Sequence, residues 1–441
     1  MKFNVTCISE GMVVPSSVTP SGVYELSAID KLPSLRCNVP SLHVYKHGGP
    51  GSANTIREAL SKALVYYYPL AGRLQVSDRN ELRVVIANCS GSSLGVWFVE
   101  ASADCTLDAV NYFDDDVMSI PYDKLLPHDH DLDDHPVKMQ VTRFECNGFV
   151  VGLIVNHTIM DGVGTAQLMN AVGETARGAE QLSIKPEWCR NFLPAPTRLF
   201  DHHPNNPNHP TTKDKDCMVE HATIDFSLYI IKDLKQEFQK WSQSNEGIVK
   251  EKTYCSTFEI SAAIIWQART RAINPIDENN NRPMKLVFYA NCRHLIPQLP
   301  KGFYGNCFFP VTVTAPSGRL ANMTLFQVVK LIQDAKAQLA DKFRQWTLAM
   351  DTNPFEEVAP DYATISVTEW DRLGFKDVDY GWGKPINVVP IQESAFITPT
   401  VVISSPPPDK AQVLRFKTWC VEKRHLQPLL RNMDIISETR V

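Results

Sequence analysis

Long apolar runs are missing from this chain, and this absence excludes a membrane-spanning helix. The most apolar segment, residues 149–155, is broken by Gly152 and is far shorter than the roughly 20 residues that a bilayer requires. The first residues, MKFNVTCISEGMVV, also lack the apolar stretch of a secretory signal peptide. We therefore expect a cytoplasmic protein with no membrane partner.

Long basic runs are also missing. Lys and Arg number 44 against 49 Asp and Glu, which gives a formal net charge of -5. A protein that binds nucleic acid neutralises phosphates with a surface rich in Lys and Arg. The charge pattern therefore predicts no nucleic-acid partner.

Paired cysteine motifs are the third absence. The 11 cysteines are spread from Cys7 to Cys420, and none is spaced C-x-x-C. An odd number of scattered cysteines is typical of reduced thiols in an intracellular protein.

An acidic segment with histidines, HDHDLDDH at residues 128–135, is the first candidate for chemistry. Its aspartates begin like a calcium-binding EF-hand loop, but Asp134 stands where that loop needs Gly, and Gln140 stands where it needs Glu. No second ligand cluster occurs, so we predict a solvated acidic loop and no metal.

A second candidate is Ser93 in Gly91-Ser-Ser-Leu-Gly95, which matches the G-x-S-x-G pattern of a serine hydrolase. That pattern needs a strand before the serine and a helix after it. The residues that follow, VWFVE, are β-branched and aromatic and predict a strand. We therefore interpret Ser93 as part of a hairpin turn.

Helical and strand patterns occur in both halves of the chain, which predicts a mixed α/β fold. Thr324 and Gln327 have the spacing of a capping box at the start of the longest expected helix. A segment with five prolines, 192–216, interrupts the periodic elements and is interpreted as a crossover loop between two domains. Helices are expected at 54–67, 165–177, 226–242, 257–272 and 324–346, and strands at 81–88, 96–100, 285–290, 398–403 and 413–421. A strand pair is expected over 144–155, with Asn147-Gly148 as its break.

The third candidate is His157, which follows the most apolar expected strand and precedes an expected helix. A histidine held at the end of a buried strand can act as a general base near neutral pH. The alternative is a core histidine with a satisfied hydrogen bond, and the residues alone favour that alternative because no serine or cysteine is paired with His157. As a base, His157 would have to deprotonate a bound substrate directly.

Two motifs resemble those of the plant BAHD acyltransferases. HTIMDG at 157–162 fits H-x-x-x-D-G, and DYGWGKP at 379–385 fits D-F-G-W-G-K-P with Tyr380 in place of Phe. Shorter segments at 60–73, 256–259, 291–293 and 302–306 extend the resemblance over nearly the whole chain. The combination is most similar to the branch with alcohol, benzoyl, taxane and monolignol acyltransferases.

The resemblance implies an α/β fold of two chloramphenicol-acetyltransferase-like domains with mixed sheets, which a long crossover loop joins and which enclose a through-channel. The domains would be an N-terminal one over 1–191 with the HxxxD motif and a C-terminal one over 217–441 with the DYGWG motif. It also implies a monomeric acyltransferase of plant specialised metabolism with no permanently bound cofactor. Acyl-CoA would be the co-substrate, and an aromatic acyl group, hydroxycinnamoyl or benzoyl, or a short one would pass to a small-molecule alcohol.

The resemblance also assigns roles to residues. His157 would be the general base, the indole N–H of Trp370 would donate to the oxyanion of the tetrahedral intermediate, and the Thr368 hydroxyl would position the acceptor. Ser256 and Thr257 would contact the coenzyme near the start of a helix. Structural support would come from an Asp161–Arg293 pair and from a rigid turn made by Asp379, Gly381, Trp382 and Gly383.

Three other functions stay open at this point. An amine acceptor would give an amide with the same base and oxyanion donor. A non-catalytic ligand-binding relative would keep the fold but would not need His157. A serine hydrolase would use Ser93.

Overall fold

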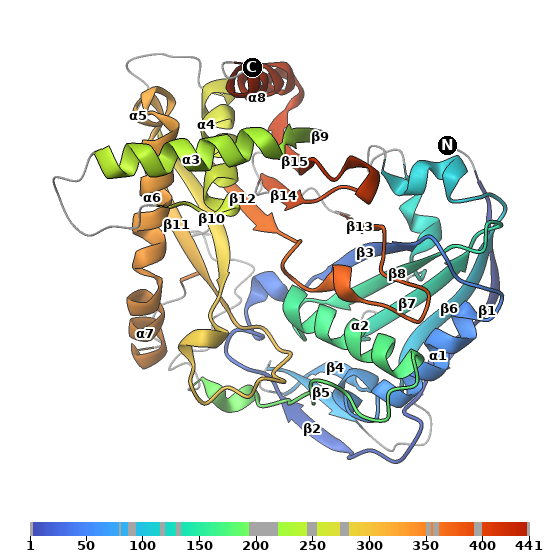
Figure 1. Cartoon of the computed structure of the whole chain (residues 1–441). Coiled ribbons are helices and arrows are strands. Elements are labelled where there is room, and N and C mark those ends of the chain that lie inside the picture. The colour runs from blue at the N-terminus through green and yellow to red at the C-terminus, as the bar shows by residue number, and fades with distance from the viewer. Residues whose placement is uncertain are drawn as a thin grey trace. The chain divides into compact units, whose positions relative to one another are not determined.

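The protein is described from a computed structural model (Figure 1). The described residues are 3–78, 81–86, 94–114, 120–128, 134–193, 219–244, 254–273, 282–349, 354–355, 361–391 and 399–438. Ser93, the middle of the acidic segment and nearly all of the expected crossover loop lie outside them. The hairpin-turn interpretation of Ser93 therefore stays a prediction.

The chain forms two compact units. Unit 1 contains residues 1–200, 292–307 and 371–393, and unit 2 contains residues 201–291, 308–370 and 394–441. These units are not the two continuous halves expected from the sequence, because 292–307 and 371–393 return to unit 1. The DYGWG motif consequently belongs to the unit that also contains HTIMDG.

Unit 1 is built on a six-stranded sheet in the order β1-β6-β7-β8-β3-β13. Only the β6–β7 pair is parallel, and β13 joins the edge by antiparallel pairing with β3. β8 is a continuous apolar strand that is buried on both faces, as a central strand requires. The strands are β1 (Val5–Val13), β3 (Asn38–Tyr45), β6 (Val96–Ala103), β7 (Val137–Arg143), β8 (Phe149–Asn156) and β13 (Asn387–Pro390).

Two helices and a small second sheet complete unit 1. The helices α1 (Ser52–Ala63) and α2 (Gly162–Ala176) pack against each other, and α1 also contacts β7. The second sheet has the order β2-β5-β4. Its strands are β2 (Gly22–Glu25), β4 (Arg73–Val76) and β5 (Leu82–Ile86).

Unit 2 contains the other six-stranded sheet, in the order β11-β10-β12-β14-β15-β9. The β10–β12 and β12–β14 pairs are parallel and the remaining pairs are antiparallel. Both large sheets are therefore mixed, which confirms the predicted α/β class. The strands are β9 (Val219–Ser227), β10 (Pro283–Asn291), β11 (Phe308–Pro316), β12 (Thr364–Glu369), β14 (Thr400–Ser404) and β15 (Val413–Glu422).

Helix α4 is the centre of the hydrophobic core of unit 2. It is buried along most of its length and contacts α3, α5, α6 and α8 as well as β12 and β15. Because helices and strands surround it, α4 is buried on nearly all sides, whereas α3 buries one apolar stripe. The helices are α3 (Leu228–Ser244), α4 (Thr257–Ile273), α5 (Ser317–Asn322), α6 (Leu325–Ala337), α7 (Leu339–Ala349) and α8 (Lys423–Glu438).

The expected helix over 324–346 is the element that differs most from its prediction. The capping box of Thr324 and Gln327 is confirmed, but the segment forms two helices, α6 and α7. The amide of Gln338 bonds to the carbonyls of Ala335 and Lys336, so the last turn tightens and α6 ends there. An uninterrupted apolar stripe does not reveal such a break.

Within the described ranges, no helix combines the length and the apolar character that crossing a bilayer demands.

Candidate active site

His157 is the first residue after β8 in unit 1. Its amide donates to the carbonyl of Cys37 at 2.8 Å, and the buried hydroxyl of Thr158 donates to the carbonyl of Leu35 at 3.1 Å. The turn closes when the amide of Ile159 bonds to the carbonyl of Asn156. The half-buried imidazole is therefore held between a rigid strand and the start of α2.

Asn306 holds the imidazole through its side-chain amide. The Nδ1 atom of His157 lies 3.1 Å from Oδ1 of Asn306, and Nδ2 of Asn306 donates to the carbonyl of His157 at 2.8 Å. A carbonyl oxygen can only accept, so we infer that Nδ1 carries the proton of the neutral ring. The basic lone pair of His157 is then on Nε2.

Asp161 has two structural tasks, as the ion-pair partner of Arg293 and as the N-cap of α2. Its carboxylate forms a bidentate ion pair with Arg293 at 2.8 and 2.9 Å, which confirms the expected pairing. It also accepts from the amide of Gly164 as the N-cap of α2 and from the amide of Cys307. Burial alone would lower the pKa of Arg293, but the Asp161 charge outweighs burial and raises it above its ordinary value.

The segment 302–307 packs tightly on the start of α2. A Cβ atom at Gly164 would stand 1.8 Å from the carbonyl oxygen of Tyr304, so no larger residue fits there. Burial raises the pKa of the Cys307 thiol to about 12, so this cysteine stays protonated and is a poor nucleophile. The tight packing fixes Asn306 relative to His157.

The DYGWG motif forms a turn at the other end of α2. Oδ1 of Asp379 accepts from the amides of Gly381 and Gly383 at 2.7 and 2.9 Å, and both glycines have positive φ. The carbonyl of Asp379 accepts from the guanidinium of Arg177, the C-cap of α2, and Trp382 makes an edge contact with Phe149. These contacts are those of a structural turn.

Thr368 and Trp370 belong to unit 2, on and just after β12. The amide of Trp370 donates to the carbonyl of Ile403 at 3.0 Å, which extends the ladder by one residue. Both side chains are half-buried and, two positions apart, project to the same face of the sheet. Val367 between them is fully buried in the hydrophobic core on the opposite face.

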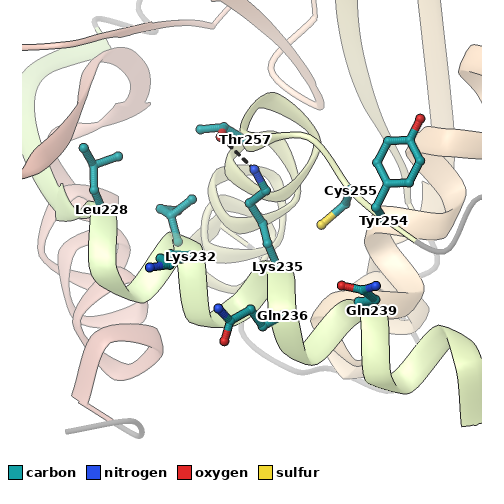
Figure 2. A pocket seen from close by; sticks show the side chains of 9 residues that line it. Leu228, Lys232, Lys235, Gln236, Gln239, Tyr254, Cys255 and Thr257 are labelled. Carbon is teal, nitrogen blue, oxygen red and sulfur yellow. Dashed lines mark hydrogen bonds between the residues drawn. The ribbon is translucent and has the colours of Figure 1, made fainter.

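Ser256 and Thr257 lie at the start of α4. Ser256 and Glu259 form a reciprocal capping box with distances of 2.9 and 3.1 Å. Thr257 lines a pocket of about 280 Å³, together with Tyr254 and Cys255 before it and residues of α3. Figure 2 shows Lys235 reaching from α3 toward Thr257, where Nζ lies 3.4 Å from the hydroxyl oxygen.

No group of three or more His, Cys, Asp or Glu side chains able to hold a metal occurs in the part of the chain that the structure describes. Of the acidic segment, His128, Asp134 and His135 are described, and the imidazole of His135 lies 2.9 Å from the Asp134 carboxylate. The predicted solvated loop at 129–133 lies outside the described residues.

Sequence reasoning missed two residues of this site, Asn306 and Asp30. Asn306 is the last residue of the segment 302–306, to which the resemblance assigns no role, and no sequence pattern links Asp30 to the HTIMDG motif. Their contact with each other is at 2.8 Å from Nδ2 of Asn306 to Oδ1 of Asp30. The only available signal for Asn306 was its place beside Cys307 and near Arg293 in sequence.

Comparisons with known proteins define the class. A family model described as the Transferase family matches residues 3–416. The chain is 37% identical to myricetin 3-O-glucosyl 1,2-rhamnoside 6'-O-caffeoyltransferase AT2 of Crocosmia x crocosmiiflora, over 98% of this chain and 99% of the relative. It is 33% identical to 3'-N-debenzoyl-2'-deoxytaxol N-benzoyltransferase of Taxus canadensis, over 88% and 86%.

The fold is also similar to that of a protein with a solved structure. The crystal structure of vinorine synthase matches with a TM-score of 0.69 at 21% identity, over 98% of each chain. The chain therefore belongs to the Transferase family, the BAHD acyltransferases, and is an acyltransferase, as its motifs predicted.

Proposed function

We propose that this protein transfers an acyl group from an acyl-CoA thioester to the hydroxyl of a small-molecule alcohol, with His157 as the general base. The observation that carries the proposal is the hydrogen bond at Nδ1 of His157, 3.1 Å from Oδ1 of Asn306. With the proton on Nδ1, the basic lone pair is on Nε2, the atom that would take the proton of an acceptor.

The acyl group passes directly from the thioester to the acceptor, without a covalent enzyme intermediate. Nε2 of His157 takes the proton of the acceptor hydroxyl as its oxygen attacks the thioester carbonyl. The tetrahedral intermediate then expels the thiolate of coenzyme A, which receives the proton from the imidazolium. The products are an ester and free coenzyme A.

The resemblance also gives Trp370 and Thr368 roles in the chemistry. By resemblance, the indole N–H donates to the oxyanion and the Thr368 hydroxyl positions the acceptor. Their placement on the face of β12 opposite the core supports contact with a ligand rather than a role in packing.

We place the phosphate-bearing end of coenzyme A at the start of α4. Ser256 and Thr257 are expected there by resemblance, and the pocket at Thr257 is also lined by Lys232 and Lys235. Two ammonium groups beside the amides of a helix N-terminus suit a phosphate. The hydroxyl of Ser256 accepts from the amide of Glu259 in the capping box, and its own proton can still be donated to a phosphate oxygen.

The acyl group is proposed to be aromatic, of the hydroxycinnamoyl or benzoyl type, or short. The caffeoyltransferase relative supports an oxygen acceptor, and the N-benzoyltransferase relative keeps an amine acceptor as the second candidate. A non-catalytic binding protein is disfavoured because His157 is present and Asn306 holds its imidazole and its carbonyl. We further propose a cytoplasmic monomer of plant specialised metabolism.

A substrate matrix tests this function. Purified protein is incubated with acetyl, benzoyl and hydroxycinnamoyl thioesters of coenzyme A against alcohols and amines, and the products are identified by mass spectrometry. Esters are expected, with intersecting initial-rate lines and no effect of EDTA. Parallel lines, or an acylated protein, would contradict the direct transfer.

Substitution of the base is the second test. His157→Ala should lower turnover by about 10² to 10⁴-fold while leaving coenzyme A affinity nearly unchanged. His47→Ala, which changes an exposed histidine, is the control and should keep full activity. Near-normal turnover of His157→Ala would reduce His157 to a structural residue.

Trp370→Phe tests the oxyanion donor separately. Phe keeps most of the ring and removes the N–H, so turnover should fall by about 10² to 10³-fold, more than either Michaelis constant changes. If only the acceptor Michaelis constant rises, Trp370 contacts the acceptor and does not stabilise the intermediate.

A further inference from the structure

Asp30 is a fully buried carboxylate directly behind Asn306. Its Oδ1 accepts from the side-chain and backbone N–H groups of Asn306 at 2.8 and 3.2 Å. Its Oδ2 accepts from Arg190 Nη1 at 2.7 Å and from the amide of Ser27 at 3.0 Å. Both carboxylate oxygens therefore have two donors, as a buried charge requires.

Arg190 is equally buried and links Asp30 to the HTIMDG segment. Its side chain is 3% exposed, and Nη2 donates to the carbonyl of Ile159 at 2.8 Å. Its guanidinium lies over the ring of Trp188 at 4.1 Å. A Cβ atom at Gly305 would stand 1.9 Å from Nη1, so the glycine before Asn306 makes room for this arginine.

The orientation of the Asn306 amide decides which nitrogen of His157 carries a proton. Nδ2 of Asn306 faces three acceptors, namely Oδ1 of Asp30 and the carbonyls of His157 and Thr158. A flipped amide would put its oxygen against all three and its NH₂ group against Nδ1 of His157. The ring would then accept at Nδ1 and carry its proton on Nε2, where no acceptor proton could be taken.

We propose that the buried Asp30–Arg190 pair is the positioning device for the base: it orients the Asn306 amide, which in turn holds His157 in the tautomer with a basic Nε2. This inference rests on the proposed role of His157 as general base. Asp30 and Arg190 touch no reacting atom in it and act through Asn306.

A purely structural ion pair is the competing explanation, and it makes a different prediction. Loss of such a pair lowers stability but leaves the tautomer of His157 unchanged. The tautomer is therefore the property to measure, and it needs no turnover.

The first measurement uses the unaltered protein. With ¹⁵N-labelled histidine, long-range ¹H–¹⁵N spectra distinguish a protonated Nδ1 from a protonated Nε2, and His157→Ala identifies the signal. A protonated Nδ1 is expected. A protonated Nε2 overturns the proposal even if every Asp30 variant fails to fold.

The second measurement uses Asp30→Asn. The new amide must present its oxygen to Arg190, so its NH₂ group faces Asn306 and forces that amide to turn. His157 should shift toward the Nε2-protonated form, and turnover should fall by about 10- to 100-fold, as is typical for loss of a residue that orients a functional group. Both Michaelis constants should stay nearly unchanged.

Arg190→Lys and Arg269→Lys form a matched pair. Arg269 is also fully buried, and it donates to the carbonyls of Cys420 and Tyr362 in unit 2. Both variants should lose thermal stability, but only Arg190→Lys should reduce turnover and alter the His157 spectrum. Equal spectra in the two variants would overturn the proposal.

The outcomes separate this inference from the proposed function. Lost turnover of Asp30→Asn with an unchanged tautomer makes the pair structural and overturns the inference alone. Full activity of His157→Ala overturns the proposed function and, with it, the catalytic meaning of the tautomer.

Discussion

A motif aspartate lies near each end of α2, and the two aspartates make different contacts. Asp161 is the N-cap of α2, and Asp379 lies in the turn that contacts the C-cap residue Arg177. Asp161 at the N-terminal end is buried, charge-paired with Arg293 and bonded to two amides. Asp379 at the C-terminal end is half-buried and closes its own turn through Gly381 and Gly383. The same residue type is thus a buried charge at one end and a turn former at the other.

The difference shows that a motif can be diagnostic of the family without taking part in the reaction. Both motifs identify the family. Among the described residues, contacts through 302–307 link Asp161 to Asn306 and His157, and no such contacts are described for Asp379. Changes at the Asp161 end should therefore affect turnover, whereas changes at the other end should affect stability.

The largest effect is expected for the buried ion pair. Asp161→Asn and Arg293→Ala should each cost about 3 to 5 kcal/mol, because each leaves an uncompensated buried partner, and each should reduce turnover. The double variant should be little worse than either single one. Chemical denaturation and initial rates measure both quantities.

The control for that cycle is the exposed pair of Lys384 and Asp377 near the DYGWG turn, 2.9 Å apart. Lys384→Ala should change neither stability nor turnover appreciably. Additive losses in the Asp161–Arg293 cycle would show that the two residues act independently.

Gly164→Ala should be next in size. Its methyl group would clash with the Tyr304 carbonyl, so the segment with Asn306 must shift, at a cost of about 1 to 3 kcal/mol. Turnover should fall with it, as initial rates would show. Gly318→Ala, where a Cβ atom meets nothing within 4 Å, should keep full activity.

Acid should destabilise unit 1 through His43, which is fully buried in β3 against Phe375. Burial lowers the pKa of His43 to about 3, so the unfolded chain binds a proton below about 6.5 that the folded chain does not. The free energy of unfolding is therefore highest above about pH 6.5. It should fall by about 2 kcal/mol between pH 6.5 and 5. Urea denaturation at several pH values measures this slope.

His43→Gln is the matched variant, since it keeps a polar group for Ser41, whose hydroxyl lies 3.0 Å from Nε2 of His43. The variant should have a flatter dependence of stability on pH over the same range. An identical slope would mean that another group is responsible.

The smallest effect is expected at Asp379. Asp379→Ala removes the acceptor of two amides in a partly exposed turn and should cost about 1 kcal/mol, with turnover nearly unchanged. Asp379→Asn keeps an oxygen and should restore the stability. A large loss of turnover in either variant would contradict the structural role and would make the two ends of α2 equivalent.

Local patterns predicted most of the fold. The helices near 54–67, 165–177 and 257–272 and the strands near 285–290 and 413–421 form where apolar periodicity indicated. The break at Gln338 was not predicted, because a single tightened turn leaves the apolar period intact.

The site was only partly predictable, for a physical reason. Residues within one motif, such as His157 and Asp161, can be related by their spacing. The contacts of Asn306 with Asp30 and of Asp30 with Arg190 span long stretches of chain, and a single sequence contains no measure of such distances. The compact units differ from continuous halves for the same reason, since β13 pairs with β3 from far along the chain.

The return of 292–307 and 371–393 to unit 1 also constrains how the protein can be made on a ribosome. A nascent chain that ends before residue 292 has His157 but neither Arg293 nor Asn306. Its main sheet ends at β3, because β13 has not yet been synthesised. Unit 1 therefore completes only after residue 393 has emerged, when residues 201–291 and 308–370 of unit 2 have also been synthesised. Neither half of the gene could encode a working fragment, and splitting this enzyme for complementation would require a cut outside both returning segments.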